Sequence, residues 1–93
     1  MCKVKIIKLI ALFEYLAHVE TSPAFKKILK AYNNVYLAIS NKEEKNISEK
    51  DFKPLLNVYK IYSEARPKDL LLGKYVMDKM QEFYNYQKKI VEK

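Results

Sequence analysis

The side chains that could carry catalysis are few in this chain of 93 residues, and they form no recognisable set. His18 is the single histidine, and nothing near it in the sequence proposes an oriented partner or a substrate pocket. A general base needs a partner that orients it and a reacting group within hydrogen-bonding reach. His18 lies near the end of a predicted helix, where a cationic imidazole interacts favourably with the helix dipole. We therefore interpret His18 as a structural residue.

The other chemically active residue types lead to the same conclusion. Cys2 is the single cysteine, which excludes an intramolecular disulfide and a multi-cysteine metal site. The 11 acidic residues follow no spacing typical of a metal site. The single glycine cannot build a phosphate-binding loop. The sequence predicts a protein that is not an enzyme and holds no cofactor.

Lysine and tyrosine are the residue types that the chain offers for binding. The formal net charge is +7, and Arg66 is the single arginine among 18 basic residues. Lysine suits diffuse attraction to an anionic surface, whereas base reading favours arginine, so no nucleic-acid partner is expected. The chain has eight tyrosines, a residue type enriched at protein interfaces. Of these, Tyr75 and Tyr86 are expected to face outward.

Four long helical segments must position these side chains. Apolar residues recur in each segment at the i, i+3, i+4 and i+7 spacing of an amphipathic helix. One glycine and three prolines are too few turn residues for a β-sandwich. We expect helices at about residues 3–19, 23–42, 52–65 and 68–91. Their short connections favour antiparallel neighbours, so the predicted fold class is all-α, a single-domain antiparallel up-down four-helix bundle over residues 1–93.

Capping signals set the expected helix boundaries. Ser22 followed by Pro23 is typical of an N-cap and a first helical turn. Asp51 is preferred to Ser48 as the third N-cap, because Ser48 would place Pro54 too deep in the helix.

The helical stripes also predict which side chains are buried. The residues expected in the core are Ile6, Leu9, Ile10, Phe13, Leu16 and Ala17 in the first helix, Phe25, Ile28, Leu29, Tyr32, Val35, Tyr36 and Ile39 in the second, Leu55, Val58, Tyr59, Tyr62 and Ala65 in the third, and Leu70, Val76, Met77, Met80, Phe83, Tyr84, Gln87 and Ile90 or Val91 in the fourth. Four further apolar residues widen the face of the first helix, so that it is expected to touch two neighbours: Ile7, Leu12, Tyr15 and Val19.

The N-terminal segment imitates a secretory signal, since lysines precede an apolar run. However, Lys8 interrupts this run, and Glu14 follows within it. A spanning helix needs about 20 apolar residues without such charges. We expect a helix that is retained in a soluble domain, not a targeting segment.

Two stretches resemble the class IIa bacteriocin immunity proteins, the enterocin A immunity family. The first, residues 22–37, contains the polar-Pro-x-aromatic start of the family's second helix, its Ile-Leu pair and its Val-Tyr-Leu step. The second, residues 51–57 (DFKPLLN), resembles the head of the family's third helix, with its Asp, its proline and its apolar-apolar-Asn run.

The resemblance implies a cytosolic four-helix bundle that protects a bacterium from a pore-forming peptide by binding. The implied partner is the mannose phosphotransferase permease with bound bacteriocin, which the protein approaches from the cytoplasmic side. The resemblance is also compatible with peripheral association of the protein with the inner face of the cell membrane. The resemblance also places recognition in the C-terminal half, and we expect the protein to be a monomer. The candidate partner-binding residues are Lys60, Arg66, Lys74, Tyr75, Lys79, Tyr86, Lys88 and Lys89.

Two other functions stay open at this point. A small basic helical adaptor could bind nucleic acid through its lysine-rich faces, with a steep dependence on salt and little sequence preference. A peripheral protein could bind an anionic membrane surface through Lys3, Lys5 and Lys8 beside the apolar first helix.

Overall fold

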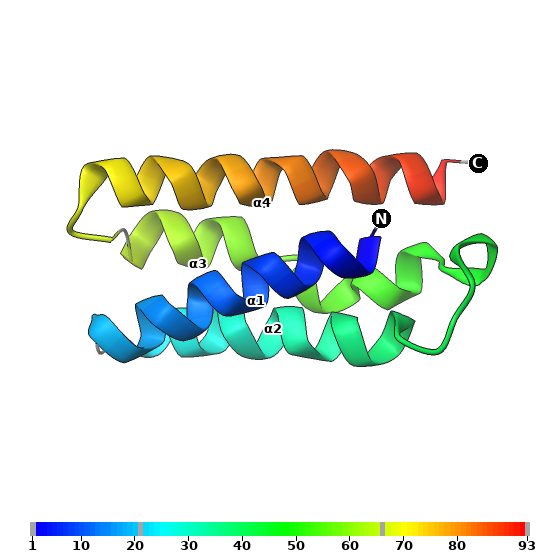
Figure 1. Ribbon diagram of the computed structural model, residues 1–93, viewed down its shortest axis with the longest axis horizontal. Helices are drawn as coiled ribbons and strands as arrows, with labels where there is room; N and C mark the ends of the chain where they lie inside the picture. The colour runs from blue at the N-terminus through cyan, green and yellow to red at the C-terminus, as the bar shows by residue number, and fades with distance from the viewer. Residues whose placement is uncertain (1, 21, 66, 93) are drawn as a thin grey trace.

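Four α-helices and two short 3-10 helices make up the fold. The computed structural model describes residues 2–20, 22–65 and 67–92, and the side chains from residue 4 onward. The elements are α1 (Cys2–Val19), α2 (Pro23–Ile39), η1 (Glu44–Asn46), η2 (Glu49–Leu55), α3 (Val58–Ala65) and α4 (Leu70–Val91). Successive helices run in opposite directions (Figure 1), so the predicted antiparallel four-helix bundle is confirmed.

The core is a continuous apolar cluster with aromatic rings at its centre. The backbones in closest contact are those of α1 with α2 and α4, and of α2 with η2 and α3. The Phe13 ring stacks on Tyr32 and meets Tyr62 edge-on, at centroid distances of 5.8 Å and 6.0 Å. Phe83 on α4 meets Tyr32 edge-on at 6.0 Å. These ring contacts join all four helices. Burying each large apolar side chain contributes about 1.5–3 kcal/mol to the stability of the fold.

The start of α2 is as predicted. The Ala24 N–H donates to the Ser22 hydroxyl over 3.3 Å, and Pro23 occupies the first turn. The helix ends at Ile39, earlier than the predicted residue 42. The residues that follow, 40–46, carry no large apolar side chain that could hold a further turn against the core. Ile47 is the first buried side chain after α2, and it attaches the loop to the core.

The predicted third helix, residues 52–65 with Asp51 as its N-cap, is wrong in its first half. Residues 49–55 form η2, with Ser48 as N-cap, and α3 begins only at Val58. The Asp51 carboxylate lies inside η2, where it accepts from the Ser48 N–H over 3.0 Å. Pro54 has no N–H for a helical ladder, and it is accommodated in the 3-10 segment.

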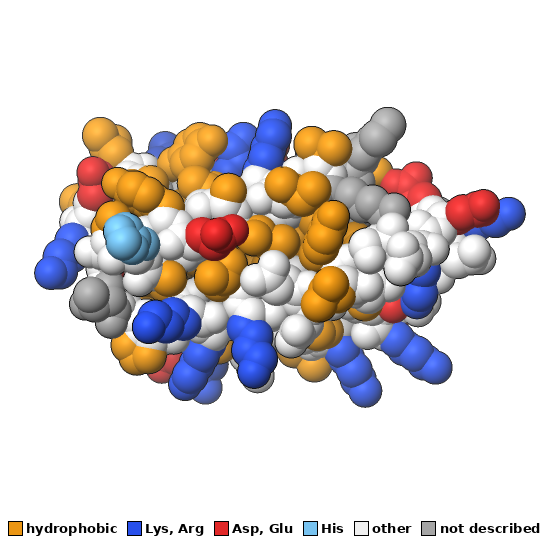
Figure 2. Space-filling model, turned by 60° about the horizontal axis from the view of Figure 1, so that its bottom comes forward, with side chains coloured by type: hydrophobic (Ala, Val, Ile, Leu, Met, Phe, Trp, Pro, Cys, Tyr) orange, Lys and Arg blue, Asp and Glu red, His pale blue; other side chains and the backbone are white. Residues whose placement is uncertain are grey.

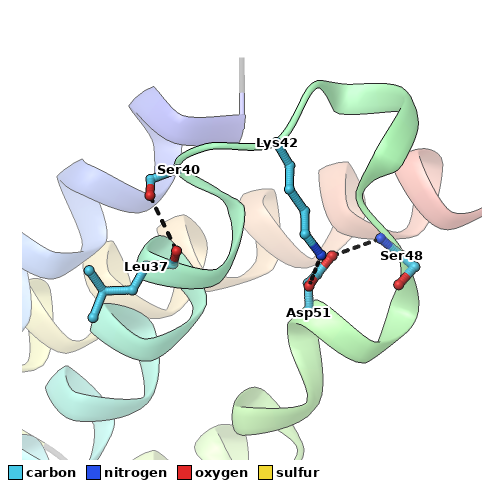
Figure 3. A network of polar contacts seen from close by, with 5 residues as sticks. All are labelled: Leu37, Ser40, Lys42, Ser48 and Asp51. Atoms are coloured by element: carbon cyan, nitrogen blue, oxygen red, sulfur yellow. Dashed lines mark hydrogen bonds and ion pairs between the residues drawn. The ribbon is translucent and has the colours of Figure 1, made fainter.

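An ion pair closes the loop between α2 and η2 (Figure 3). The Lys42 ammonium donates to the buried Asp51 carboxylate over 2.7 Å. Burial alone would raise the pKa of Asp51, but the hydrogen bonds from Lys42 and Ser48 outweigh it and hold this pKa below its usual value. The same carboxylate completes a capping box with Ser48, which places Asp51 inside η2 as its third residue.

The fourth helix begins at Leu70, after the predicted residue 68. The Asp69 carboxylate caps it by accepting from the N–H groups of Leu71 and Leu72, at 2.9 Å and 3.1 Å. Leu70 is not in the core as predicted, because its side chain is 83% exposed. It lies six residues before the buried Val76, about 240° away around the helix.

The other predicted core positions divide between buried and partly exposed. Among the α1 side chains that the structure describes, every fully buried one belongs to the predicted stripe. The wider face predicted for α1 is exposed in large part: Ile7, Tyr15 and Val19 each expose about half of their surface. Tyr84 and Val91 of α4 are also on the exposed side. Over the described residues, no helix has the length and apolar character needed to cross a membrane.

Candidate functional site

No cluster of side chains suited to metal binding occurs among the described residues. They contain no group of three or more His, Cys, Asp or Glu side chains that could hold a metal ion. His18 is exposed in the last turn of α1, where the sequence placed it. Two hollows of the surface are lined by aromatic side chains and are described in turn.

The first lies between α1 and α4 and is called the Tyr75 surface below. It is a hollow of about 330 Å³ lined by Lys8, Ala11, Leu12, Tyr15, Tyr75 and Lys79. Tyr15 and Tyr75 are 56% and 51% exposed, so each ring offers a free face or edge. Figure 2 shows the neighbouring face over α1 and α2, where hydrophobic side chains lie between projecting lysines.

Charged side chains hold the α4 edge of the Tyr75 surface in place. The Lys79 ammonium lies 5.4 Å from the centre of the Tyr75 ring and 3.0 Å from the Glu82 carboxylate. The hydrogen bond with Glu82 raises the pKa of Lys79. Lys79 is therefore a cation tethered beside an exposed ring.

Exposed leucines extend this surface toward the start of α4. Leu70 and Leu71 are each 83% exposed. Leu71 is four residues before Tyr75, which places both on one face of the helix. Lys74 lies next to them and borders a separate hollow of about 230 Å³. The leucine pair has no counterpart among the predicted site residues, because the helical pattern assigned Leu70 to the core.

The second surface lies between η2, α3 and α4 and is called the aromatic groove below. Its volume is about 420 Å³, and it is lined by Tyr32, Phe52, Leu55, Leu56, Tyr59, Gln81, Phe83, Tyr84 and Gln87. The Tyr59 and Tyr84 rings meet edge to face at 5.9 Å. The Lys88 ammonium lies 5.6 Å from the centre of the Tyr84 ring, at the groove's border.

Two tyrosine hydroxyls connect α3 to α4. Tyr59 donates to the carbonyl of Met80 over 2.7 Å, and Tyr62 donates to the carbonyl of Gly73 over 2.8 Å. Burial raises the pKa of each phenol to about 12, with smaller contributions from Tyr84 and from Glu20 respectively. Both hydroxyls therefore stay protonated and keep donating at neutral pH.

The predicted site residues are only partly brought together. Tyr75 and Lys79 form one contact, with Lys74 nearby, whereas Lys60 is exposed on α3. Lys88 and Lys89 are exposed in the last turn of α4. Arg66 lies outside the described residues.

Tyr86 does not face outward as predicted. It is half-buried against the core, and its hydroxyl donates to the Glu44 carboxylate. The Lys5 ammonium lies 5.7 Å from its ring centre. Tyr86 is three residues after Phe83 and four before Ile90, so it borders the buried stripe of α4. Its role is to hold the η1 loop against the helices.

Comparison of the chain with family models, with curated proteins and with solved structures gives no match. Function must therefore be inferred from the residues themselves.

Proposed function

We propose that this protein is an immunity protein against a class IIa bacteriocin. It binds the bacteriocin-engaged mannose phosphotransferase permease from the cytoplasmic side, as a monomer and without catalysis, and so protects the cell that makes it. The observation that carries the proposal is the Tyr75 surface, a half-apolar hollow flanked by two exposed tyrosines and two lysines. The resemblance of residues 22–37 and 51–57 to the enterocin A immunity family supplies the type of partner.

The Tyr75 surface has the properties of a protein-binding site. Tyrosine gives a large contact area at a low cost in conformational entropy, and interface energy is often concentrated in such aromatic anchors. Ala11 and Leu12 add apolar side chains to the lining of the same hollow. Lys8 and Lys79 favour an acidic partner and accelerate its approach. The fitting partner surface is an acidic segment that inserts an apolar residue.

The Tyr75 surface includes residues of both halves of the chain, whereas the family resemblance places recognition in the C-terminal half alone. The resemblance implies recognition by the C-terminal half, which supplies Tyr75 and Lys79 from α4. Tyr15 and Lys8 come from α1, so the proposal assigns part of the contact to the N-terminal half. An exchange of the C-terminal half alone is expected to transfer recognition only in part.

The proposal is tested by protection of a bacterium that is sensitive to pediocin-like bacteriocins. The native chain, Tyr15→Ala, Tyr75→Ala and the double variant are expressed at matched levels. Leu37→Ala is the matched control, because Leu37 is a 69% exposed apolar residue on α2, outside this hollow. Inhibitory bacteriocin concentrations are then compared across a panel of such peptides.

The native chain and Leu37→Ala are expected to raise the inhibitory concentration for at least one peptide. Truncation of an aromatic anchor to alanine weakens the binding free energy by about 2 kcal/mol or more. Each tyrosine variant is therefore expected to reduce the protection, measured as the rise in inhibitory concentration, tenfold or more. Absence of protection by the native chain against the whole panel would overturn the immunity function. Full protection by the double variant would overturn the Tyr75 surface as the contact.

A second candidate function is binding to an anionic membrane surface, which one observation favours. Leu70 and Leu71 are exposed at the start of α4, between Lys68 and Lys74. Exposed leucines can enter the headgroup layer while lysines attract anionic lipid. Co-sedimentation with phosphatidylglycerol vesicles that is lost in a Leu70→Ser, Leu71→Ser variant would support this function. Equal sedimentation of both proteins would count against it.

A further inference from the structure

The aromatic groove has the size and lining of a small-molecule site. Its volume of about 420 Å³ lies within the range of about 300–1,000 Å³ that is usual for ligand pockets. Five of its nine lining side chains are aromatic and two are leucines, and none of the nine is charged. Such a lining favours an uncharged, ring-bearing occupant.

One buried polar group that lines the groove, the Tyr32 hydroxyl, has no partner among the described residues. Tyr32 is 1% exposed, yet no hydrogen bond involving its hydroxyl occurs among the described residues. Over the same residues, no fully enclosed side-chain oxygen or nitrogen lacks a partner. The Tyr32 hydroxyl must therefore reach open space, and the open space that Tyr32 borders is the groove.

The surroundings of Tyr32 leave its hydroxyl available as a hydrogen-bond donor. Its ring is held between Phe13, which stacks on it, and Phe83, which meets it edge-on. The neighbouring Tyr59 hydroxyl is occupied by the Met80 carbonyl. Burial raises the pKa of Tyr32, so the phenol stays protonated over the physiological range. A fixed, protonated phenol in a groove without charged side chains favours a ligand that brings a hydrogen-bond acceptor.

We propose that the aromatic groove binds a small uncharged aromatic molecule whose hydrogen-bond acceptor meets the Tyr32 hydroxyl. The ring of the ligand lies among Phe52, Tyr59 and Tyr84, where offset and edge-to-face contacts are available. This site is separate from the Tyr75 surface, since no residue lines both. The inference therefore does not rest on the proposed immunity function.

The test uses two probes that have the same shape and differ in the acceptor. Benzophenone carries a carbonyl between two rings, and diphenylmethane carries a methylene in its place. Each is titrated into the isotope-labelled protein, and the backbone amide resonances are followed. Saturable shifts are expected for residues 52–59 and 81–87, which flank the groove.

A neutral hydrogen bond contributes about 0.5–1.5 kcal/mol, so benzophenone is expected to bind about 2- to 12-fold more tightly than diphenylmethane. This preference is expected to disappear in Tyr32→Phe and to persist in Tyr36→Phe. The second variant loses the same hydroxyl from the same helix, from a residue that does not line the groove.

Each remaining outcome contradicts the proposal. Shifts that never saturate, or that map outside the groove, would show that it is not a binding site. An equal preference for benzophenone in the native protein and in Tyr32→Phe would show that the Tyr32 hydroxyl does not select the ligand.

Discussion

Substitutions at three tyrosines measure how much the two side-chain hydrogen bonds between α3 and α4 contribute to the free energy of unfolding. Phenylalanine at position 59 or 62 removes a hydroxyl that donates to a main-chain carbonyl on α4. Phenylalanine at position 32 removes a hydroxyl that has no partner among the described residues. The three substitutions remove the same atom and leave each ring in place, but only those at positions 59 and 62 remove a hydrogen bond of the described residues.

The expected effects follow from this difference. A neutral hydrogen bond contributes about 1 kcal/mol net to the free energy of unfolding. The carbonyls of Gly73 and Met80 keep the helical N–H donors four residues further on, so they are not left unsatisfied. Tyr59→Phe and Tyr62→Phe are each expected to lower the free energy of unfolding by about 1 kcal/mol, and the double variant by about 2 kcal/mol. Tyr32→Phe is expected to leave it unchanged or to raise it, because no bond is lost.

Urea unfolding followed by far-ultraviolet circular dichroism measures these values, with equal m-values as the sign that the unfolding transition is unaltered. Thermal midpoints provide a second measure, since about 1 kcal/mol shifts the midpoint of a chain of this size by about 4–8 °C. A loss of stability in Tyr32→Phe as large as that in Tyr59→Phe would refute the reasoning. So would a double variant as stable as the native protein.

Three further predictions concern single features of the bundle. Asp51→Asn is expected to lower the free energy of unfolding at neutral pH by about 1 kcal/mol, because the partly exposed Lys42 loses its buried partner. The control is Glu43→Gln, which removes the exposed pair with Lys45 and is expected to have no measurable effect. The pKa of Asp51 is lowered in the folded state, so its contribution is present above the unfolded pKa of about 4 and is lost on further acidification; urea unfolding at a series of pH values measures both effects. Gly73→Ala is expected to raise the free energy of unfolding by up to about 1 kcal/mol, and with it the thermal midpoint, because alanine favours the helix. A Cβ at this position would lie 3.6 Å from Pro67 and 3.7 Å from the Tyr62 hydroxyl, which are ordinary contact distances. A lowered midpoint would mean that the Tyr62 contact is disturbed. Unfolded phenols titrate near pH 10, whereas the pKa values of Tyr59 and Tyr62 are about 12, so above pH 10 the unfolded chain loses protons that the folded chain keeps; stability should therefore fall from about pH 10 to 12, and less steeply in Tyr62→Phe.

The parts of the fold that the sequence predicted correctly are those governed by local signals. Ser22 and Pro23 mark the start of α2, and five residues of its predicted stripe are fully buried. In α1 and α4, the buried side chains are likewise ones that the sequence predicted in the core, such as Phe13 and Phe83. Periodicity succeeds here because each helix has a single face that is deeply covered.

The parts that the sequence did not predict depend on residues distant along the chain. Ser48 is the N-cap through a local capping box with Asp51, whereas the ion pair that supports the same carboxylate comes from Lys42, nine residues earlier in the chain. The hydroxyl of Tyr86, which borders the buried stripe of α4, donates to Glu44, 42 residues away in the chain. Local spacing contains neither contact.

The two candidate surfaces differ in the same way. Tyr75 and Lys79 are four residues apart on one helix, so their proximity could be predicted from the sequence. Tyr15 joins them only through the packing of α1 on α4. The aromatic groove needs residues of four elements, α2, η2, α3 and α4, at a particular separation, and its key hydroxyl, that of Tyr32, belongs to a residue that the sequence predicts only as part of the core.

The attachment of α3 to α4 through main-chain carbonyls has a consequence for how such a protein can evolve. Every residue type has a carbonyl, so the hydroxyls of Tyr59 and Tyr62 find their acceptors whatever side chains occupy the outward positions of α4. Replacements at Leu71, Lys74 or Tyr75 leave these two attachments in place. Natural selection can therefore diversify the outer face of α4 by single mutations, while the same two tyrosines preserve the geometry of the bundle beneath it.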